Sequence, residues 1–138
     1  MNLSSLMTDN IAELLVKIIE FTRARHKILA RNIYDVESPG FVPKDFVTDE
    51  FSGLLNVAID EHIANRRLLL RDTENIKFGI NGSFTAHPVV DRYAEELLNE
   101  NQSEYIEWQI NKLLENLLNQ RIAAALLRQK QEVISVLR

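Results

Sequence analysis

The C-terminal part of the chain sets the strongest limit on its fold, because residues 101–138 contain neither glycine nor proline. Asn101 can cap a helix there, with Glu104 three residues later in capping-box spacing. A straight helix over residues 102–138 would span on the order of 55 Å, whereas a domain of this size is roughly 30 Å across. Such a helix must extend past its own core. Its apolar side chains recur at helical spacing: Ile106, Ile110, Leu113, Leu114, Leu117, Leu118, Ile122, Ala125, Leu126, Val133 and Leu137.

A second amphipathic helix is predicted over residues 9–34, capped by Thr8 or Asp9, with residues 1–8 as a mobile lead-in. We expect the two terminal helices to pair as a coiled-coil-like core. Another subunit would then cover the apolar surface left over, unless both helices fold onto the middle of the chain as a closed bundle. Periodicity does not separate these two arrangements. The apolar side is Ile11, Leu14, Leu15, Ile18, Ile19, Phe21, Ile28 and Leu29; Glu13, Lys17, Arg23 and Lys27 fill the polar side.

A sharp break follows the first helix at Ser38-Pro39-Gly40. Proline presets φ for the second position of a tight turn and glycine supplies positive φ at the third. Because Pro39 also disfavours helical geometry at Ser38, the helix must end before it. We expect a loop over residues 35–50 that presents Phe41 to another surface and runs extended through residues 43–46.

The middle section, residues 51–100, is more mixed. Residues 51–67 have helical spacing, with Leu54, Leu55, Ala58, Ile59 and Ile63 predicted on one face. Asn81-Gly82 indicates a two-residue hairpin turn within residues 76–85, and Pro88 suits the first position of a short helix. The sequence therefore predicts one mainly α domain over residues 1–138, in which four glycines and three prolines favour long elements.

No pattern in the sequence indicates catalysis. There is no cysteine, and the three histidines lack the spacing of a zinc or di-iron helix site. Nucleophile-elbow, phosphate-loop and dinucleotide motifs are also missing. We expect no enzyme activity, cofactor or metal, and a structural role for His62. The apolar runs are too short to span a membrane, and no cleavable secretory signal is recognisable at the N-terminus.

Several segments together resemble the bacterial flagellar rod proteins. Residues 25–33 are similar to the end of that family's N-terminal helix, and Ser38-Pro39-Gly40-Phe41 stands where the family has its Thr-Pro-Gly-aromatic turn. Residues 44–46 and 49–55 look like the Asp-Phe and Leu-rich steps that follow in the proximal-rod branch. Residues 113–127 are similar to the closing helix of that branch.

The resemblance implies a structural subunit of the flagellar basal-body rod, a static shaft that transmits torque. It would be exported unfolded through the flagellar type III apparatus without a cleaved signal, and would assemble in the periplasm. Its partners would be other rod subunits, membrane-ring proteins and export-gate or adaptor proteins, in homo- and hetero-oligomeric contact. The expected inter-subunit residues are Asn32, Ser38, Pro39, Gly40, Phe41, Phe46, Ile110, Leu114, Leu117, Leu118 and Leu126.

Two other functions stay open from the sequence. A cytosolic helical adaptor or regulator could bind a partner helix in a groove. A helical bundle could also bind nucleic acid through the basic stripe at residues 23–31. A net charge of −4 gives no general support for nucleic acid, so we expect none among the partners.

Overall fold

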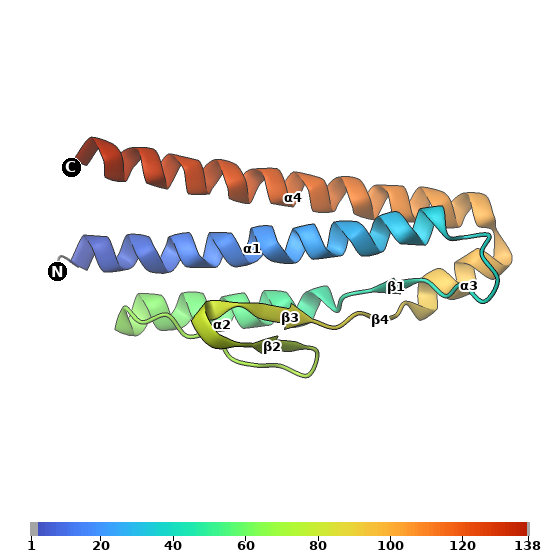
Figure 1. Ribbon diagram of the computed structural model, residues 1–138, viewed down its shortest axis with the longest axis horizontal. Helices are drawn as coiled ribbons and strands as arrows, with labels where there is room; N and C mark the ends of the chain where they lie inside the picture. Colours follow the sequence, from blue (N-terminus) through green and yellow to red (C-terminus); the bar gives the residue numbers. More distant parts are fainter. Residues whose placement is uncertain (1–2, 138) are drawn as a thin grey trace.

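Two long antiparallel helices form the frame of the molecule (Figure 1). A computed structural model describes residues 3–137. Helix α1 (Leu3–Tyr34) and helix α4 (Gln102–Leu137) lie side by side, with the start of α1 and the end of α4 at the same pole. The remaining elements, in chain order, are β1 (Lys44–Asp45), α2 (Thr48–Asn65), β2 (Ile76–Phe78), the 3-10 turn η1 (Ile80–Gly82), β3 (Phe84–Ala86), β4 (Val89–Val90) and α3 (Arg92–Glu100).

Pairing of the terminal helices confirms the predicted fold class. Leu14 and Leu29 of α1 are buried, as the apolar spacing predicted. On α4 the buried Ala123 lies outside the predicted apolar face, whereas Ala125, which was assigned to that face, is exposed. The expected start of the first helix was wrong, because α1 begins at Leu3 and includes most of the predicted lead-in. The cap of the last helix is confirmed: the backbone N–H of Glu104 donates to Asn101 Oδ1 at 3.2 Å.

The Ser-Pro-Gly turn also forms as predicted. The N–H of Phe41 donates to the carbonyl of Ser38 at 3.1 Å, and Gly40 has φ +74°. The chain then runs extended, and β1 pairs antiparallel with β4 from far along the sequence. That pairing explains why the predicted helix start at Pro88 was wrong: the next residues, Val89 and Val90, form a strand, and α3 begins at Arg92.

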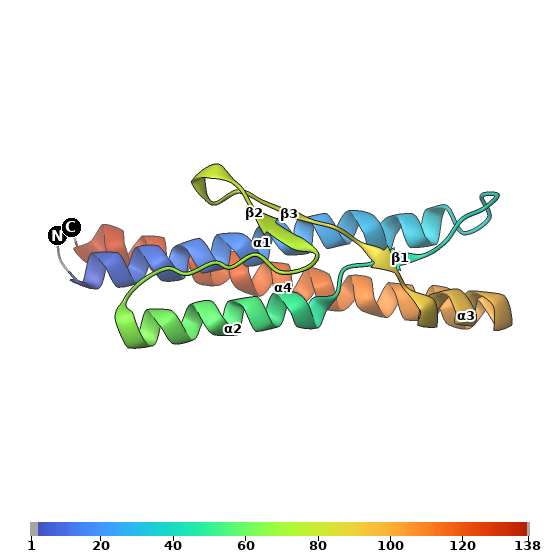
Figure 2. The ribbon, with the colours of Figure 1, turned by 90° about the horizontal axis from the view of Figure 1, so that it is seen from below.

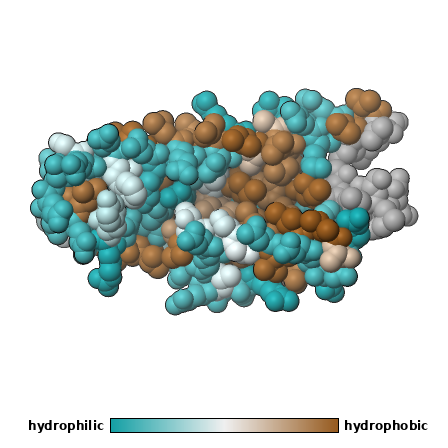
Figure 3. Space-filling view, turned by 180° about the vertical axis from the view of Figure 1, so that it is seen from behind, coloured by the Kyte–Doolittle hydropathy of each residue, from teal (hydrophilic) through white to brown (hydrophobic). Residues whose placement is uncertain are grey.

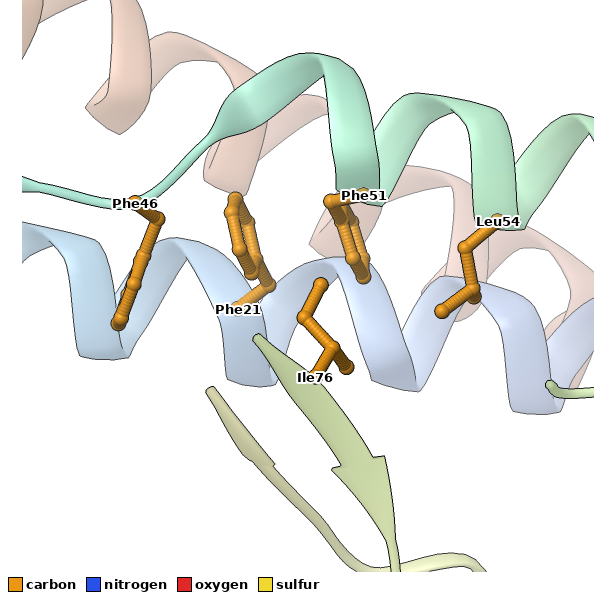
Figure 4. Packing of buried hydrophobic residues seen from close by; sticks show 5 residues of the cluster. All are labelled: Phe21, Phe46, Phe51, Leu54 and Ile76. Carbon is orange, nitrogen blue, oxygen red and sulfur yellow. The ribbon is translucent and has the colours of Figure 1, made fainter. Parts of the chain in front are cut away.

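Helix α2 packs against α1 through a cluster of aromatic and aliphatic side chains (Figure 4). The rings of Phe21 and Phe51 stack at a centroid distance of 4.0 Å, and Phe46 lies 5.1 Å from Phe21. Leu54 and Ile76 complete the buried cluster. The core therefore sits where α1, α2 and the first hairpin strand meet.

The hairpin of β2 and β3 exists, but its turn differs from the prediction. Phe78 pairs with Phe84, so residues 79–83 form the loop and a 3-10 turn replaces the two-residue Asn-Gly turn. The hairpin covers a different face of α1 from α2 (Figure 2) but meets α2 in the core, where the Phe84 ring centroid lies 6.3 Å from that of Phe51. On α1 it covers Lys17, which is only 2 % exposed instead of facing water. Lys17 Nζ is 2.9 Å from Glu13 Oε1 and 5.9 Å from the Phe84 ring centroid.

Candidate interaction surface

Apolar side chains remain exposed along α4, on the side away from α1. Ile110 is 41 % exposed, Leu114 59 % and Leu118 58 %. The buried face of the same helix holds Tyr105 and Asn116, about half a helical turn away from these side chains. We call Ile110, Leu114 and Leu118 the outer stripe. It matches three of the contact residues predicted from the sequence.

A second apolar surface is a groove of about 620 Å³ between α2 and α4, with α1 as its floor. Ile122 and Leu126 line it from α4, and Leu55 from α2. Figure 3 shows hydrophobic side chains gathered in the middle of this rear face, between the helix at the top and the helix at the bottom. Leu126, a predicted contact residue, therefore belongs to the groove and not to the outer stripe.

The α2 wall of the groove corrects the predicted helix face. Leu54 and Ala58 are buried against α1, but Ile59 is 43 % and Ile63 is 63 % exposed. These two isoleucines continue by four-residue steps the row that begins with Leu55, which lines the groove. Apolar residues on two sides of α2 were the sequence signal for this wall, and the single-face interpretation missed it.

Two of the predicted contact residues lie inside the chain. Phe46 is 8 % exposed in the aromatic cluster. Asn32 is 2 % exposed; its amide nitrogen donates to the Lys44 carbonyl at 2.7 Å and to Gln109 Oε1 at 3.1 Å. A neighbouring subunit cannot reach either side chain while this packing holds. The prediction that Asn32 and Phe46 contact another subunit was therefore wrong. Both side chains instead anchor the loop to the helix pair.

The loop itself stays at the surface. Ser38, Pro39 and Gly40 are exposed, while Phe41 is half-buried. Leu117, a predicted contact residue on α4, is also half-buried. Phe41 lines a small hollow of about 260 Å³ with Ile28 and Pro88. The ring is thus partly covered by its own chain, and the turn offers backbone and proline rather than a free aromatic side chain.

Buried polar contacts connect the two long helices. The Tyr105 hydroxyl donates to the Asn32 carbonyl at 2.6 Å, and burial together with the charge of Asp91 raises the pKa of Tyr105. Farther along, the Asn116 amide donates to the Thr22 carbonyl at 2.7 Å. A slip of one helical turn would leave these groups buried without partners, so they fix the register of α1 against α4.

A compact ion network joins the loop to both long helices. Arg25 binds the Asp45 carboxylate with two hydrogen bonds of 2.9 Å, and Lys112 Nζ lies 2.7 Å from Asp45 and 2.9 Å from Asp91. Burial alone would raise the pKa of the Asp45 carboxyl, but the hydrogen bonds from Arg25 and Lys112 outweigh burial and hold that pKa below its usual value. No sequence signal marked this network, because its members come from α1, β1, α4 and the residue that caps α3.

The ion network also takes Arg25 out of the exposed basic stripe predicted at residues 23–31. Arg25 is engaged with Asp45 and is only 12 % exposed at its side chain, while Arg23, Lys27 and Arg31 remain exposed.

Within residues 3–137, no three metal-ligating side chains come together, and no helix there has the length and hydrophobicity needed to cross a bilayer. His62 is buried, and its Nδ1 accepts a hydrogen bond from the amide nitrogen of Asn10 at 3.2 Å.

These surfaces define a helical protein with exposed apolar faces along its C-terminal helix. Comparison with protein-family models, with curated proteins and with solved structures found no match. The likeness to flagellar rod proteins therefore rests on the sequence segments themselves.

Proposed function

We propose that this protein is a structural subunit of the bacterial flagellar basal-body rod, in its proximal part. The observation that carries the proposal is the outer stripe, which leaves three large apolar side chains in water beside a helix pair that is already packed. Covering such surface is favourable by about 25 cal/mol per Å². The sequence segments that resemble the rod family lie on the same frame, in α1, the Ser-Pro-Gly turn and α4.

The function proposed is mechanical. Neighbouring subunits bind through the terminal helices and the exposed turn, and the interlocked helices transmit torque along a shaft. Partners would be further rod subunits and the ring and export proteins that surround them, in the periplasm. The stripe is suited to this role because it projects from a rigid element and not from a loop.

An in-frame deletion of the gene in its bacterium tests the assignment. Swimming would be scored on soft agar, and basal bodies would be imaged by electron cryotomography. Rings without a rod, restored by the full-length chain, are the expected result. Complete rods and normal swimming would refute the assignment and favour the cytosolic adaptor.

A point variant connects the test to the surface. Leu118→Glu should leave folding within about 0.5 kcal/mol of the wild type, because the side chain is already in water, yet it should fail to restore rods. Val57→Glu is a matched control, since Val57 is 42 % exposed on α2 and lies outside both apolar surfaces; it should restore them.

A further inference from the structure

The outer stripe has the same pattern of side chains when it is followed from either end. Leu114 lies at its centre, with Ile110 and Leu118 four residues away on either side. Seven residues from the centre, Glu107 lies toward the start of α4 and Arg121 toward its end. Because two turns of helix take about 7.2 residues, positions 107, 114 and 121 project in almost the same direction. Both charged side chains are exposed beside the apolar ones.

This pattern is complementary to itself when two copies of α4 lie antiparallel. If the two helices meet at Leu114 with their directions reversed, Ile110 of each copy lies opposite Leu118 of the other. By the same symmetry each Glu107 lies opposite an Arg121, so the contact contains two ion pairs and a row of apolar side chains between them. A parallel pair would instead place Glu107 against Glu107 and Arg121 against Arg121, which is repulsive. Charge therefore favours a second copy as the partner and also selects its direction.

The charged side chains that flank the stripe have no ionic partner within their own chain. Neither Glu107 nor Arg121 forms an ion pair with any side chain that the structure describes. In the antiparallel arrangement the two helices overlap over residues 102–126, since α4 begins at Gln102. The other charged residues on this face, Arg128 and Glu132, lie outside that overlap and do not oppose the pairing.

The shape of the molecule also leaves room for a second helix. The overlap of residues 102–126 is about 36 Å long at about 1.5 Å per residue. Near its two ends the outward positions are Ser103 and Ala125, whose small side chains allow the helices to approach closely. In Figure 1 α4 is the outermost of the long helices, with α1 between it and α2. None of the described elements lies on the far side of α4 there.

We propose that two copies of this chain form a closed antiparallel dimer through the outer stripes of their α4 helices. A two-fold contact of this kind uses the same surface on both copies and does not propagate. A shaft needs head-to-tail contacts instead, so the dimer is not a contact of the shaft. It covers the outer stripe and keeps it from every other partner, and the chain is then held in a form that cannot polymerise through that surface. The dimer goes beyond the proposed function and stands whether or not the chain is a rod subunit.

Charge reversal in the purified full-length chain tests the pairing. The variants are Glu107→Arg, Arg121→Glu and the chain that carries both substitutions. Glu74→Arg, exposed in the loop before β2, is the control, because it changes the net charge as Glu107→Arg does. Circular dichroism would first show that each variant has the wild-type helix content. Sedimentation equilibrium over a concentration series at low salt would then give the dissociation constant of the dimer.

The wild type and Glu74→Arg should sediment as monomer and dimer with no larger species. Each single reversal at position 107 or 121 places two like-charged pairs in the contact, and should raise the dissociation constant about tenfold. The double variant restores both ion pairs in exchanged order and should return to within about threefold of the wild type. Direction is tested by disulfide formation, since the chain has no cysteine of its own: a mixture of Ile110→Cys and Leu118→Cys should cross-link several-fold more than either variant alone.

Other outcomes overturn the proposal. A wild-type chain that stays monomeric up to its highest soluble concentration would mean that the stripe has a different partner or none. Polymers larger than a dimer would mean that the contact is open. A double variant that dimerises no better than the single ones would mean that the two charges do not face each other across the contact. None of these results bears on the rod assignment, because the gene deletion decides that separately.

Discussion

The ion network gives the sharpest quantitative prediction, through the substitution Asp45→Ala. The Asp45 carboxylate accepts from Arg25 and Lys112 and also from the backbone N–H of Phe46 at 2.7 Å. Its removal leaves the Arg25 guanidinium, whose side chain is 12 % exposed, without any other ionic partner within residues 3–137. Lys112 keeps Asp91 at 2.9 Å.

The expected cost follows from that asymmetry. Breaking one side of a buried ion pair destabilises a protein by about 3–5 kcal/mol, mainly because the remaining charge is desolvated and uncompensated. Since Lys112 retains a carboxylate, we expect the lower end, about 3 kcal/mol. With a urea m-value of about 2 kcal/mol/M, the unfolding midpoint should fall by about 1.5 M.

Urea unfolding followed by circular dichroism measures this change. The control is Arg67→Ala, which removes an ion pair to Glu61 whose arginine side chain is 70 % exposed; its midpoint should stay within experimental error, because exposed pairs contribute little. If Asp45→Ala lowers the unfolding midpoint by less than about 0.5 M, at an unchanged m-value, the reasoning is refuted. It would mean that Arg25 finds water or another partner at little cost.

Three further predictions concern pH, backbone geometry and salt. The pKa of Asp45 is lowered in the folded chain. The stabilising contribution of Asp45 is therefore full above pH about 4 and is lost as the pH falls through the pKa of the folded state. The stability difference between wild type and Asp45→Asn, measured by urea unfolding, should shrink as the pH falls below about 4. Gly40→Ala should lower the free energy of unfolding by about 1 kcal/mol because of its φ of +74° alone, since an added Cβ meets nothing within 4 Å. Gly53→Ala within α2 should instead raise the free energy of unfolding by up to about 1 kcal/mol in the same assay. Equal effects of the two substitutions would contradict the turn geometry. Exposed basic groups of α1 should pair with acidic groups of α3 and α4 on neighbouring chains: Arg23, Lys27 and Arg31 with Glu96, Glu100 and Glu104. Assembly, followed by sedimentation, should then weaken with rising salt. Polymers indifferent to ionic strength would contradict that pairing.

The long helices were predictable because their apolar spacing is a local property that the fold preserves. The turn was predictable for the same reason, since Pro39 and Gly40 dictate its geometry whatever surrounds it. Features set by distant segments were not. The polar side assigned to Lys17 is correct for an isolated helix, but the hairpin covers it, and that cover comes from residues far along the chain.

Strand pairing shows the same limit at Pro88. The local signal indicated a helix start, whereas hydrogen bonding of Val89 and Val90 to the β1 segment holds an extended backbone. Among the candidate contact residues, exposure on α4 was anticipated for Leu114 and Leu118. Burial of Asn32 was not, because its partners Lys44 and Gln109 come together only in the folded chain.

The contacts that fix the helix register have a consequence for how the chain acquires its structure. Asn116 meets Thr22 across 94 positions of sequence, and Tyr105 meets Asn32 across 73. Closing loops of that length is entropically slow. The face of α1 that packs on α4 therefore has no partner until α4 has left the ribosome, although Phe21 on another face can already pack on Phe51 of α2. During that interval the nascent chain is open to capture by a chaperone or an unfoldase, which is the condition a polypeptide needs if it is to be threaded through a narrow channel before it folds.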